Sequence, residues 1–207
     1  PYQDDPTLDF FHTYVVTSVR EGDPQKLSPD QLSTYTYLGA PAWHLDESEL
    51  RPEDQRTYSQ FRGYGSVEVR TGDPDWSSNG EPDQVTLTRT DYLRGMDGDR
   101  LPDGDTRDVS VTAVTGLQIT DAGPLSGWPF QVRSWNGEDG ELLRTEVSTP
   151  QVLETTASQG RDGVPDLTAN IIAATSSTVI TETVTGPVET SSSTRFDDRG
   201  RAVAQQE

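Results

Sequence analysis

The fold of this chain is decided by the stretch Ser193-Thr194-Arg195-Phe196-Asp197-Asp198-Arg199-Gly200-Arg201. The Ser and Thr residues before Phe196 are typical of a strand that ends on an aromatic ring. Asp197 can bond turn amides through its side chain, and Gly200 can adopt the positive φ that lets a chain reverse. The stretch therefore predicts a strand, a tight turn and the start of another strand, with Gly200 at positive φ.

Runs in which polar and apolar residues alternate recur along the chain and predict further strands. The turn-forming run Asn136-Gly137-Glu138-Asp139-Gly140 joins two of them into the clearest hairpin. The best helical candidate is Asp46–Arg56, with Asp46 as N-cap and Pro52 able to begin a turn. With no long 3.6-residue period, the sequence predicts an all-β chain, an antiparallel meander of strands and hairpins with little helix. The predicted strands are Leu8–Val19, Thr34–Leu38, Ser66–Arg70, Val85–Thr90, Asp108–Thr112, Phe130–Trp135, Glu141–Val147, Leu167–Val188 and Ser191–Phe196.

The composition predicts an ordered chain with a thin core. Val, Leu, Ile and Phe make up only about a fifth of the 207 residues, a level at which a highly charged chain is suspected of disorder. The 7 Tyr, the 4 Trp and the long Thr- and Val-rich runs argue for order, because these residues suit a pleated, half-buried surface. A thin core indicates a piece whose apolar faces are completed by neighbouring segments. Because the chain starts at Pro1, we expect it to be part of a longer protein.

The charge of the chain excludes two classes of partner. A formal net charge of −19 and a pI near 4.3 disfavour nucleic acid and anionic membranes, which both require a basic surface.

No apolar run approaches the roughly 18 residues of a membrane span. The chain has no Cys, which excludes disulfides and Cys-based zinc sites. The simplest interpretation of the many carboxylates is a solvated surface with acidic loops.

One acidic loop invites comparison with a calcium site. Asp97-Gly98-Asp99 and Asp103-Gly104-Asp105 place paired carboxylates on a flexible backbone, as a hard cation requires. An EF-hand that starts at Asp97 would need an oxygen ligand at its fifth position, which is Leu101, and a bidentate Glu at its twelfth, which is Asp108, so the spacing does not fit. A second run, Asp162–Leu167, lacks the preceding Asp-x-Asp of a propeller-type calcium loop. The sequence therefore leaves open whether the Asp97–Asp105 loop binds calcium or is an ordinary acidic turn.

Candidate catalytic residues are few. Nucleophilic catalysis needs a Ser, Thr or Cys beside a base. His12 lies next to Phe11 in an apolar run, and His44 follows Trp43 with no nucleophile motif nearby, so both are interpreted as packed or surface residues. A glycosidase-type carboxylate pair is not excluded, because 35 acidic residues place some pair at a productive separation in almost any fold.

The tryptophans offer one binding hypothesis. Trp43, Trp76, Trp128 and Trp135 have flat faces that suit sugar rings, and Trp76 in its Gly/Pro/Ser-rich loop is the best candidate for such a platform. The structural alternative is that they are core or edge residues. Trp128 and Trp135 are expected to pack across the hairpin, where aromatic cross-strand pairs contribute about 0.2–1 kcal/mol each.

Four motifs carry a resemblance to a known family. They are Thr36–His44, Tyr58–Tyr64, Tyr92–Asp99 and Phe196–Arg201. In these motifs and in their order, the chain resembles bacterial Rhs/YD-repeat proteins of the secreted actinobacterial type, which are related to toxin-complex shell proteins. The resemblance runs from about Thr34 to the end. It divides the chain into N-terminal strands of unassigned kind, residues 1–33, and a YD-repeat-like β region, residues 34–207.

The resemblance implies a structural role. In this family the repeats wind a long antiparallel sheet into a shell around a C-terminal toxin or effector. The chain is then expected to be a non-catalytic wall segment of a secreted protein, extracellular or at the cell surface, with neighbouring repeats of the same parent chain and an enclosed effector domain as partners. It lacks the family's autoproteolytic core segment and toxin tip, so no catalytic, cofactor-binding or metal-binding residue and no cofactor is assigned.

Two other function classes stay open from the sequence. One is a secreted β-sandwich adhesin or carbohydrate-binding module that shares the turn chemistry, and the other is an acidic glycosidase. A binding module should have a closed two-layer core and an exposed aromatic patch, whereas a shell segment should have open strand edges.

Overall fold

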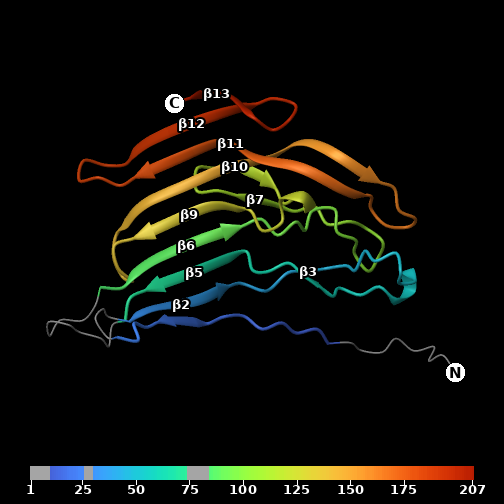
Figure 1. The fold of residues 1–207 in the computed structure, drawn as a ribbon, viewed down its shortest axis with the longest axis horizontal. Helices are drawn as coiled ribbons and strands as arrows, with labels where there is room; N and C mark the ends of the chain where they lie inside the picture. The colour runs from blue at the N-terminus through green and yellow to red at the C-terminus, as the bar shows by residue number, and fades with distance from the viewer. Residues whose placement is uncertain (1–9, 26–29, 74–83) are drawn as a thin grey trace.

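The structure is a computed structural model that describes residues 10–25, 30–73 and 84–207. One nine-stranded sheet dominates it, in which strand order follows the sequence and every pairing is antiparallel (Figure 1). The prediction of an all-β antiparallel meander is confirmed. From one edge to the other, the strands are β1 (Ser18–Glu21), β2 (Gln31–Leu38), β5 (Ser66–Thr71), β6 (Thr86–Tyr92), β9 (Pro129–Trp135), β10 (Leu142–Gln159), β11 (Leu167–Thr181), β12 (Val188–Phe196) and β13 (Ala202–Gln206).

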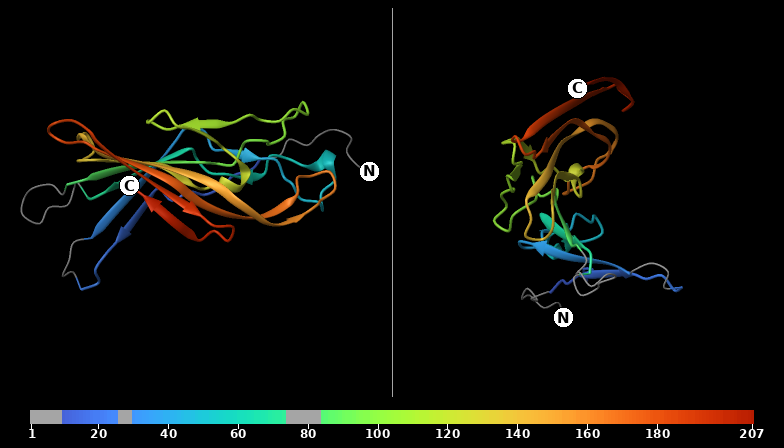
Figure 2. Two further views of the ribbon diagram at one scale, coloured as in Figure 1. Left: turned by 90° about the horizontal axis from the view of Figure 1, so that it is seen from above. Right: turned by 90° about the vertical axis from the view of Figure 1, so that its left-hand side faces the viewer.

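Two excursions interrupt the meander. Between β2 and β5, the short strands β3 (Trp43–His44) and β4 (Gln60–Phe61) pair with each other, and a single 3₁₀ turn, η1 (Glu53–Gln55), lies between them. Between β6 and β9, β7 (Ser110–Thr112) and β8 (Gln118–Thr120) form a hairpin that is followed by the 3₁₀ turn η2 (Gly123–Leu125). Figure 2 shows this second hairpin standing off one side of the sheet, which is itself strongly twisted and curved.

The longest strands, β10 and β11, extend as a two-stranded arm past the end of their neighbours (Figures 1 and 2). Their pairing shifts register at three places, and the first lies between Thr149 and Pro150. Proline has no backbone N–H, so a bulge is one of the few places where it fits inside a sheet. Bulges bend a strand and increase its local twist, which accounts for the curvature of the arm.

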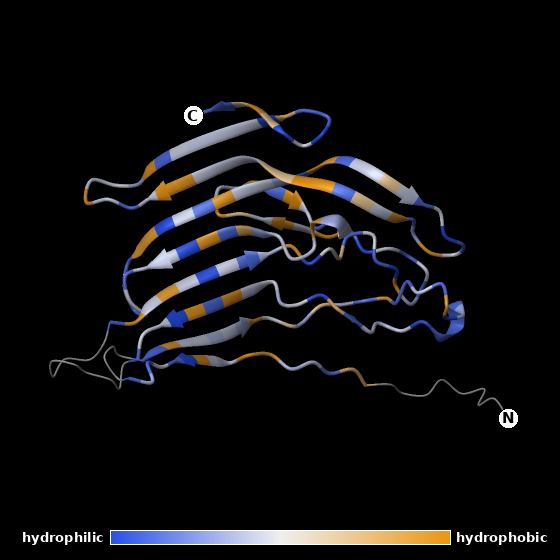
Figure 3. Ribbon diagram, viewed as in Figure 1, coloured by the Kyte–Doolittle hydropathy of each residue, from blue (hydrophilic) through white to orange (hydrophobic). Residues whose placement is uncertain are grey.

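The apolar core is small and lies on one face of the middle of the sheet. It forms where hairpin β7–β8 and η2 pack against the central strands, and Val111, Leu117, Ala122, Trp128 and Ile172 surround it. Along β5, β6 and β9, hydrophilic and hydrophobic residues alternate as the sequence predicts (Figure 3). All five residues of β13 are exposed, so the layer thins toward that edge. The buried centre consists of Leu93, Ala113, Ile119, Leu125, Phe130 and Val147.

The helical candidate Asp46–Arg56 is confirmed only in part: Pro52 begins a turn as predicted, but Asp46 does not cap a helix. Only the 3₁₀ turn Glu53–Gln55 forms, and Pro52 is its N-cap. Asp46 instead accepts a hydrogen bond from the amide of Ser48, in an Asx turn. A residue before proline is disfavoured in the helical conformation, so Pro52 separates the predicted first turn from the second.

The strand predicted over Leu8–Val19 is also wrong for most of its described length, because β1 begins only at Ser18. The residues before it have an edge position and only sparse contacts with β2. The carbonyl of Thr17 accepts a bond from the Tyr35 amide, and that of Val16 accepts one from the Tyr37 hydroxyl. Residues 33 and 34 both lie inside β2, so the sheet is continuous across that position.

Candidate functional site

The turn after Phe196 has the geometry that its sequence predicts. β12 ends at Phe196, Gly200 has φ +71°, and β13 begins two residues later. Asp197 Oδ1 accepts hydrogen bonds from the amides of Arg199 (3.0 Å) and Arg201 (2.8 Å), while Oδ2 accepts one from Arg201 Nε (2.8 Å). The Arg201 amide and guanidinium, together with the Arg199 amide, hold the pKa of Asp197 below its ordinary value despite the opposing effect of desolvation. One carboxylate thus organises the whole turn.

Replacing Gly200 with Val should destabilise the protein at this turn. A β-branched residue at positive φ costs about 1–3 kcal/mol, and a Cβ at Gly200 would lie 2.6 Å from Cγ2 of Ile171. At about 2–4 °C per kcal/mol for a chain of this size, the melting temperature should fall by several degrees. The matched control is Gly186→Val, since Gly186 has φ +117° but no atom within 4 Å of its would-be Cβ. Equal losses in both variants would contradict the role of the Ile171 contact.

A second aromatic-led turn, after Tyr92, uses a carboxylate from elsewhere. Gly95 has φ +70°, but the side chain that binds the turn amides is the fully buried Asp121. It accepts hydrogen bonds from the amides of Arg94 (2.6 Å), Gly95 (2.7 Å) and Met96 (3.2 Å). Sequence reasoning missed Asp121, because it acts on a turn more than twenty residues away and belongs to no local motif.

Three carboxylates of the Asp97–Asp105 loop, those of Asp97, Asp99 and Asp103, are internal hydrogen-bond acceptors. Asp97 Oδ1 accepts from the amide of Val109 (2.9 Å), and Asp103 Oδ1 accepts from the amide of Asp105 (3.2 Å). Asp99 is buried and accepts from the amide of Leu45. Within the described ranges, no three His, Asp or Glu side chains are grouped so that they could hold a metal ion.

His44 is buried beside acidic groups. Its Nε2 lies 3.5 Å from Asp99 Oδ1 and 3.9 Å from Glu47 Oε1, and its Nδ1 is 2.8 Å from the carbonyl oxygen of Leu45. Arg107 Nε donates to the other oxygen of Asp99 at 3.1 Å. In the part of the chain that the structure covers, no hydrogen bond joins His44 to a Ser or Thr hydroxyl. The arrangement ties β3 to the loop after β6 and contains no activated nucleophile.

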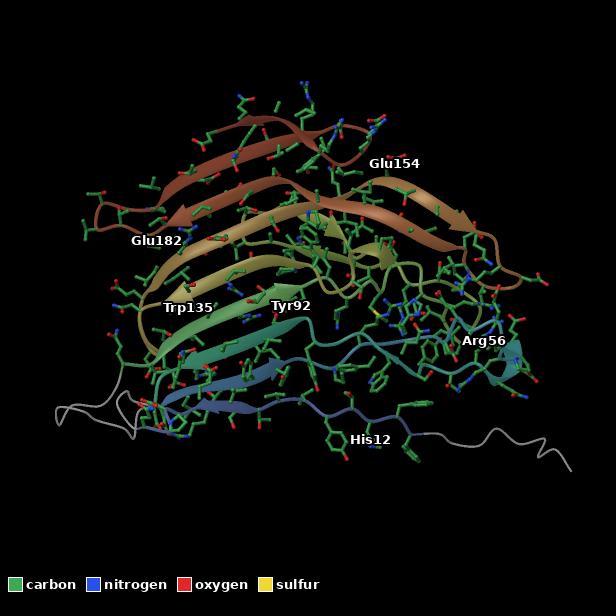
Figure 4. All side chains as sticks on the ribbon, viewed as in Figure 1. His12, Arg56, Tyr92, Trp135, Glu154 and Glu182 are labelled. Carbon is green, nitrogen blue, oxygen red and sulfur yellow. The ribbon has the colours of Figure 1, made fainter. Side chains whose placement is uncertain are left out.

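Among the described residues, no hydrogen bond, ion pair or ring contact joins His12 to His44. His12 lies on the extended segment before β1 (Figure 4), where its ring makes an edge contact with Tyr14, the ring centroids being 5.7 Å apart. Its side chain is exposed.

No ring contact joins the three described tryptophans, Trp43, Trp128 and Trp135, to one another. Trp128 flanks the core, and its indole Nε1 donates to Ser148 on β10 (3.2 Å). Trp135 pairs with Leu142 across the hairpin, and Arg133 lies 5.7 Å from the centre of its ring. Trp128 therefore packs against the opposite strand as predicted, whereas for Trp135 the structure shows the backbone pairing with Leu142 and a ring contact within its own strand. Trp76 lies outside the described residues, so the proposed platform at that position is not described.

Trp43 belongs to an aromatic row that the sequence did not reveal. Its ring centroid lies 6.3 Å from that of Phe11 and 5.2 Å from that of Phe61, and the row continues through Tyr64 to Tyr37 at 6.1 Å and 4.9 Å. A largely apolar groove of about 390 Å³ runs beside Tyr37, Phe61 and Tyr64. The β3–β4 pairing sets Trp43 opposite Phe61, while Phe11 comes from the segment before β1 and Tyr37 from β2.

The two edges of the sheet differ in chemistry. β1 is four residues long, and its Arg20 forms ion pairs with Asp30 and Asp73. β13 has the sequence Ala-Val-Ala-Gln-Gln, with neither a charge nor a proline, and it pairs only with β12 among the described strands. Sheet edges are commonly blunted by short strands, charges, prolines or bulges. β1 is short and charged, whereas β13, which is five residues long and has a register shift in its pairing with β12, offers an exposed edge without charge or proline.

No helix in the described part of the chain is long and apolar enough to cross a membrane. Comparison with known proteins found no family model, no curated protein and no solved structure that matches this chain.

Proposed function

We propose that this chain is a non-catalytic structural segment of a secreted Rhs/YD-repeat-type protein, and that it forms part of a β-sheet wall that encloses or presents a C-terminal effector. The observation that carries the proposal is the open edge of the sheet at β13. The backbone groups of that edge are available for another strand, and its side chains carry no charge that would repel one. Neighbouring repeats of the parent chain are the partners that this edge fits.

Two further features support a wall segment. The strand order follows the sequence, so the sheet can continue by adding one strand after another at the same edge. The apolar core is confined to the centre, as expected of a repeat layer whose stability comes from stacking with its neighbours. The motif Phe196–Arg201, which carries the family resemblance, forms a tight turn in which Asp197 accepts hydrogen bonds from the turn amides and Gly200 has positive φ.

The secreted adhesin or carbohydrate-binding module is the second candidate, and the row from Phe11 to Tyr37 favours it. Flat aromatic rings along a groove of about 390 Å³ suit sugar stacking. A sandwich module requires a second sheet facing the first, however, and the described residues form one large sheet with two small two-stranded additions. The wall segment therefore accounts for more of the fold.

Hydrogen–deuterium exchange tests the proposal at β13. In the chain alone, we expect the outward-facing amides of Ala202–Gln206 to exchange rapidly, because no strand covers them. In the parent protein they should be protected to the level of the β11 amides, and cryo-electron microscopy should show a further strand beside β13. The matched control is the β1 edge: its charged residues disfavour pairing with another strand, so the exchange of its outward-facing amides should differ little between the chain alone and the parent protein. Unprotected β13 amides in the parent protein would favour the closed binding module.

A further inference from the structure

A pocket lined by three arginines lies on the face of the sheet that hairpin β7–β8 covers. A cavity of about 340 Å³ is lined by residues of β6, β9 and the hairpin, and Arg89, Arg94 and Arg133 all contribute to it. Arg89 and Arg133 are direct cross-strand partners in the β6–β9 ladder. Like charges directly opposite each other destabilise a sheet, so this pairing needs a compensating negative charge.

The protein supplies only part of that charge. Asp91 Oδ1 accepts a hydrogen bond from Arg89 Nε (3.1 Å), and its Oδ2 accepts one from Arg133 Nη2 (3.1 Å). Both guanidinium groups therefore share one carboxylate. Every other arginine that forms an ion pair within the described ranges has a carboxylate that no second arginine uses. In a chain with a net charge of −19, this local excess of positive charge is unusual.

Donors on two of the three arginines are unused. The Nε of Arg133 is buried and has no hydrogen-bond acceptor among the described residues. Arg94 uses its backbone in hydrogen bonds with Asp121 and Ser126, while its guanidinium has no partner within the described part of the chain. The Arg94 guanidinium lines the cavity without a partner, so it can meet an acceptor that comes from outside, whereas the buried Nε of Arg133 becomes accessible only if the groups that cover it shift.

We infer that this cavity, the Arg89–Arg94–Arg133 pocket, binds a small oxyanion of the carboxylate or phosphate class. Guanidinium groups present planar forks of N–H donors that match both anions. The bound anion would lie in the pocket beside the Asp91 carboxylate and would neutralise the positive charge of the arginines that Asp91 does not balance. Phe130 and Val111 form apolar walls beside the arginines, which suits an anion with a short apolar body. This site is independent of the β13 edge and of the proposed wall function.

Nuclear magnetic resonance of the arginine side chains tests the inference directly. The ¹⁵N-labelled protein is titrated with sodium phosphate, sodium acetate and, as control, sodium chloride at matched ionic strength. We expect saturable shifts of the Arg133 and Arg94 Nε–Hε signals with phosphate or acetate and none with chloride. Saturation by phosphate alone or by acetate alone identifies the class of ligand. Shifts that are absent, or equal with chloride, would overturn the inference.

Arg94→Gln is the decisive variant, because the Arg94 side chain has no partner within the fold and its loss should leave the melting temperature unchanged. The anion affinity should fall about tenfold, as expected for loss of one charge-assisted contact. The matched control is Arg195→Gln, which removes the same charge from β12, outside this cavity. An unchanged affinity in Arg94→Gln, or an equal loss in Arg195→Gln, would refute the assignment.

Discussion

Asp121→Ala should cost about 4 kcal/mol of folding stability, a large part of the ~5–15 kcal/mol typical of a domain. The Asp121 side chain is fully buried, and three consecutive amides, those of Arg94, Gly95 and Met96, donate to it. Without the carboxylate, these donors stay buried without an acceptor, and each such group costs about 1–3 kcal/mol before any relaxation. Urea denaturation monitored by tryptophan fluorescence measures the loss.

Two companion variants isolate the cause. Asp121→Asn keeps one oxygen for Arg94 and Gly95, so it should recover about half of the stability lost in Asp121→Ala. Asp103→Ala removes an aspartate that bonds only the amide of Asp105 in an exposed loop, so it should change stability by less than about 0.5 kcal/mol. A loss in Asp103→Ala as large as that in Asp121→Ala would show that the loop as a whole, rather than this hydrogen-bond set, determines the effect.

The second large effect concerns Asp91. Burial raises the pKa of Asp91, but hydrogen bonds from Ser66, Gln131 and Arg89 and the charge of Arg133 outweigh it, so the pKa lies below its ordinary value. The folded state thus favours the ionised form. Its contribution is complete above the unfolded pKa of about 3.9 and is lost as the pH falls through the lower folded pKa. Asp91→Asn should therefore cost about 3 kcal/mol at neutral pH.

The pH dependence distinguishes this effect from a loss of packing. The stability difference between the wild type and Asp91→Asn should be constant near neutral pH and shrink below about pH 4, where the wild-type carboxylate also becomes neutral. Denaturation curves at several pH values measure it. The matched control is Glu154→Gln on the exposed arm of β10, labelled in Figure 4, which should be nearly neutral at every pH. A difference that persists unchanged at pH 3 would mean that the charge of Asp91 is not what stabilises the sheet.

The parts of the fold that the sequence predicts are those that short-range physics controls. The turn at Asp197 and Gly200 is complete within five residues, and the hairpin between β9 and β10 follows from two alternating runs and the Gly-rich turn that joins them. The alternation also predicts the strands, because a pleated strand places neighbouring residues on opposite faces. Local patterns were misleading where a proline or a missing neighbour intervened, as at Pro52 and along the segment before Ser18.

The candidate sites were not predictable in the same way, since they depend on register between distant strands. Arg89 and Arg133 become neighbours only through the β6–β9 ladder, and His44 meets Asp99 only because β3 lies beside the loop after β6. In the sequence, Asp91 and Asp121 look like ordinary members of an acidic chain. Their burial comes from hairpin β7–β8 and the strands beneath it, which no local pattern encodes.

Because the strand order follows the chain order, the strands can be added to the sheet one after another during folding. Each strand of the nine-stranded sheet pairs with the strand of that sheet that precedes it in the chain, so the sheet can grow in one direction as the chain is synthesised. Most of these additions close only short loops, which favours rapid pairing. The additions of β5 and β9 are the exceptions, because β3, η1 and β4 intervene before β5, and hairpin β7–β8 and η2 intervene before β9. The excursion before β9 is the longer of the two, and Phe130 of β9 meets the core residues that it supplies. We therefore expect docking of β9 to be the slow step, after which the remaining strands add in sequence.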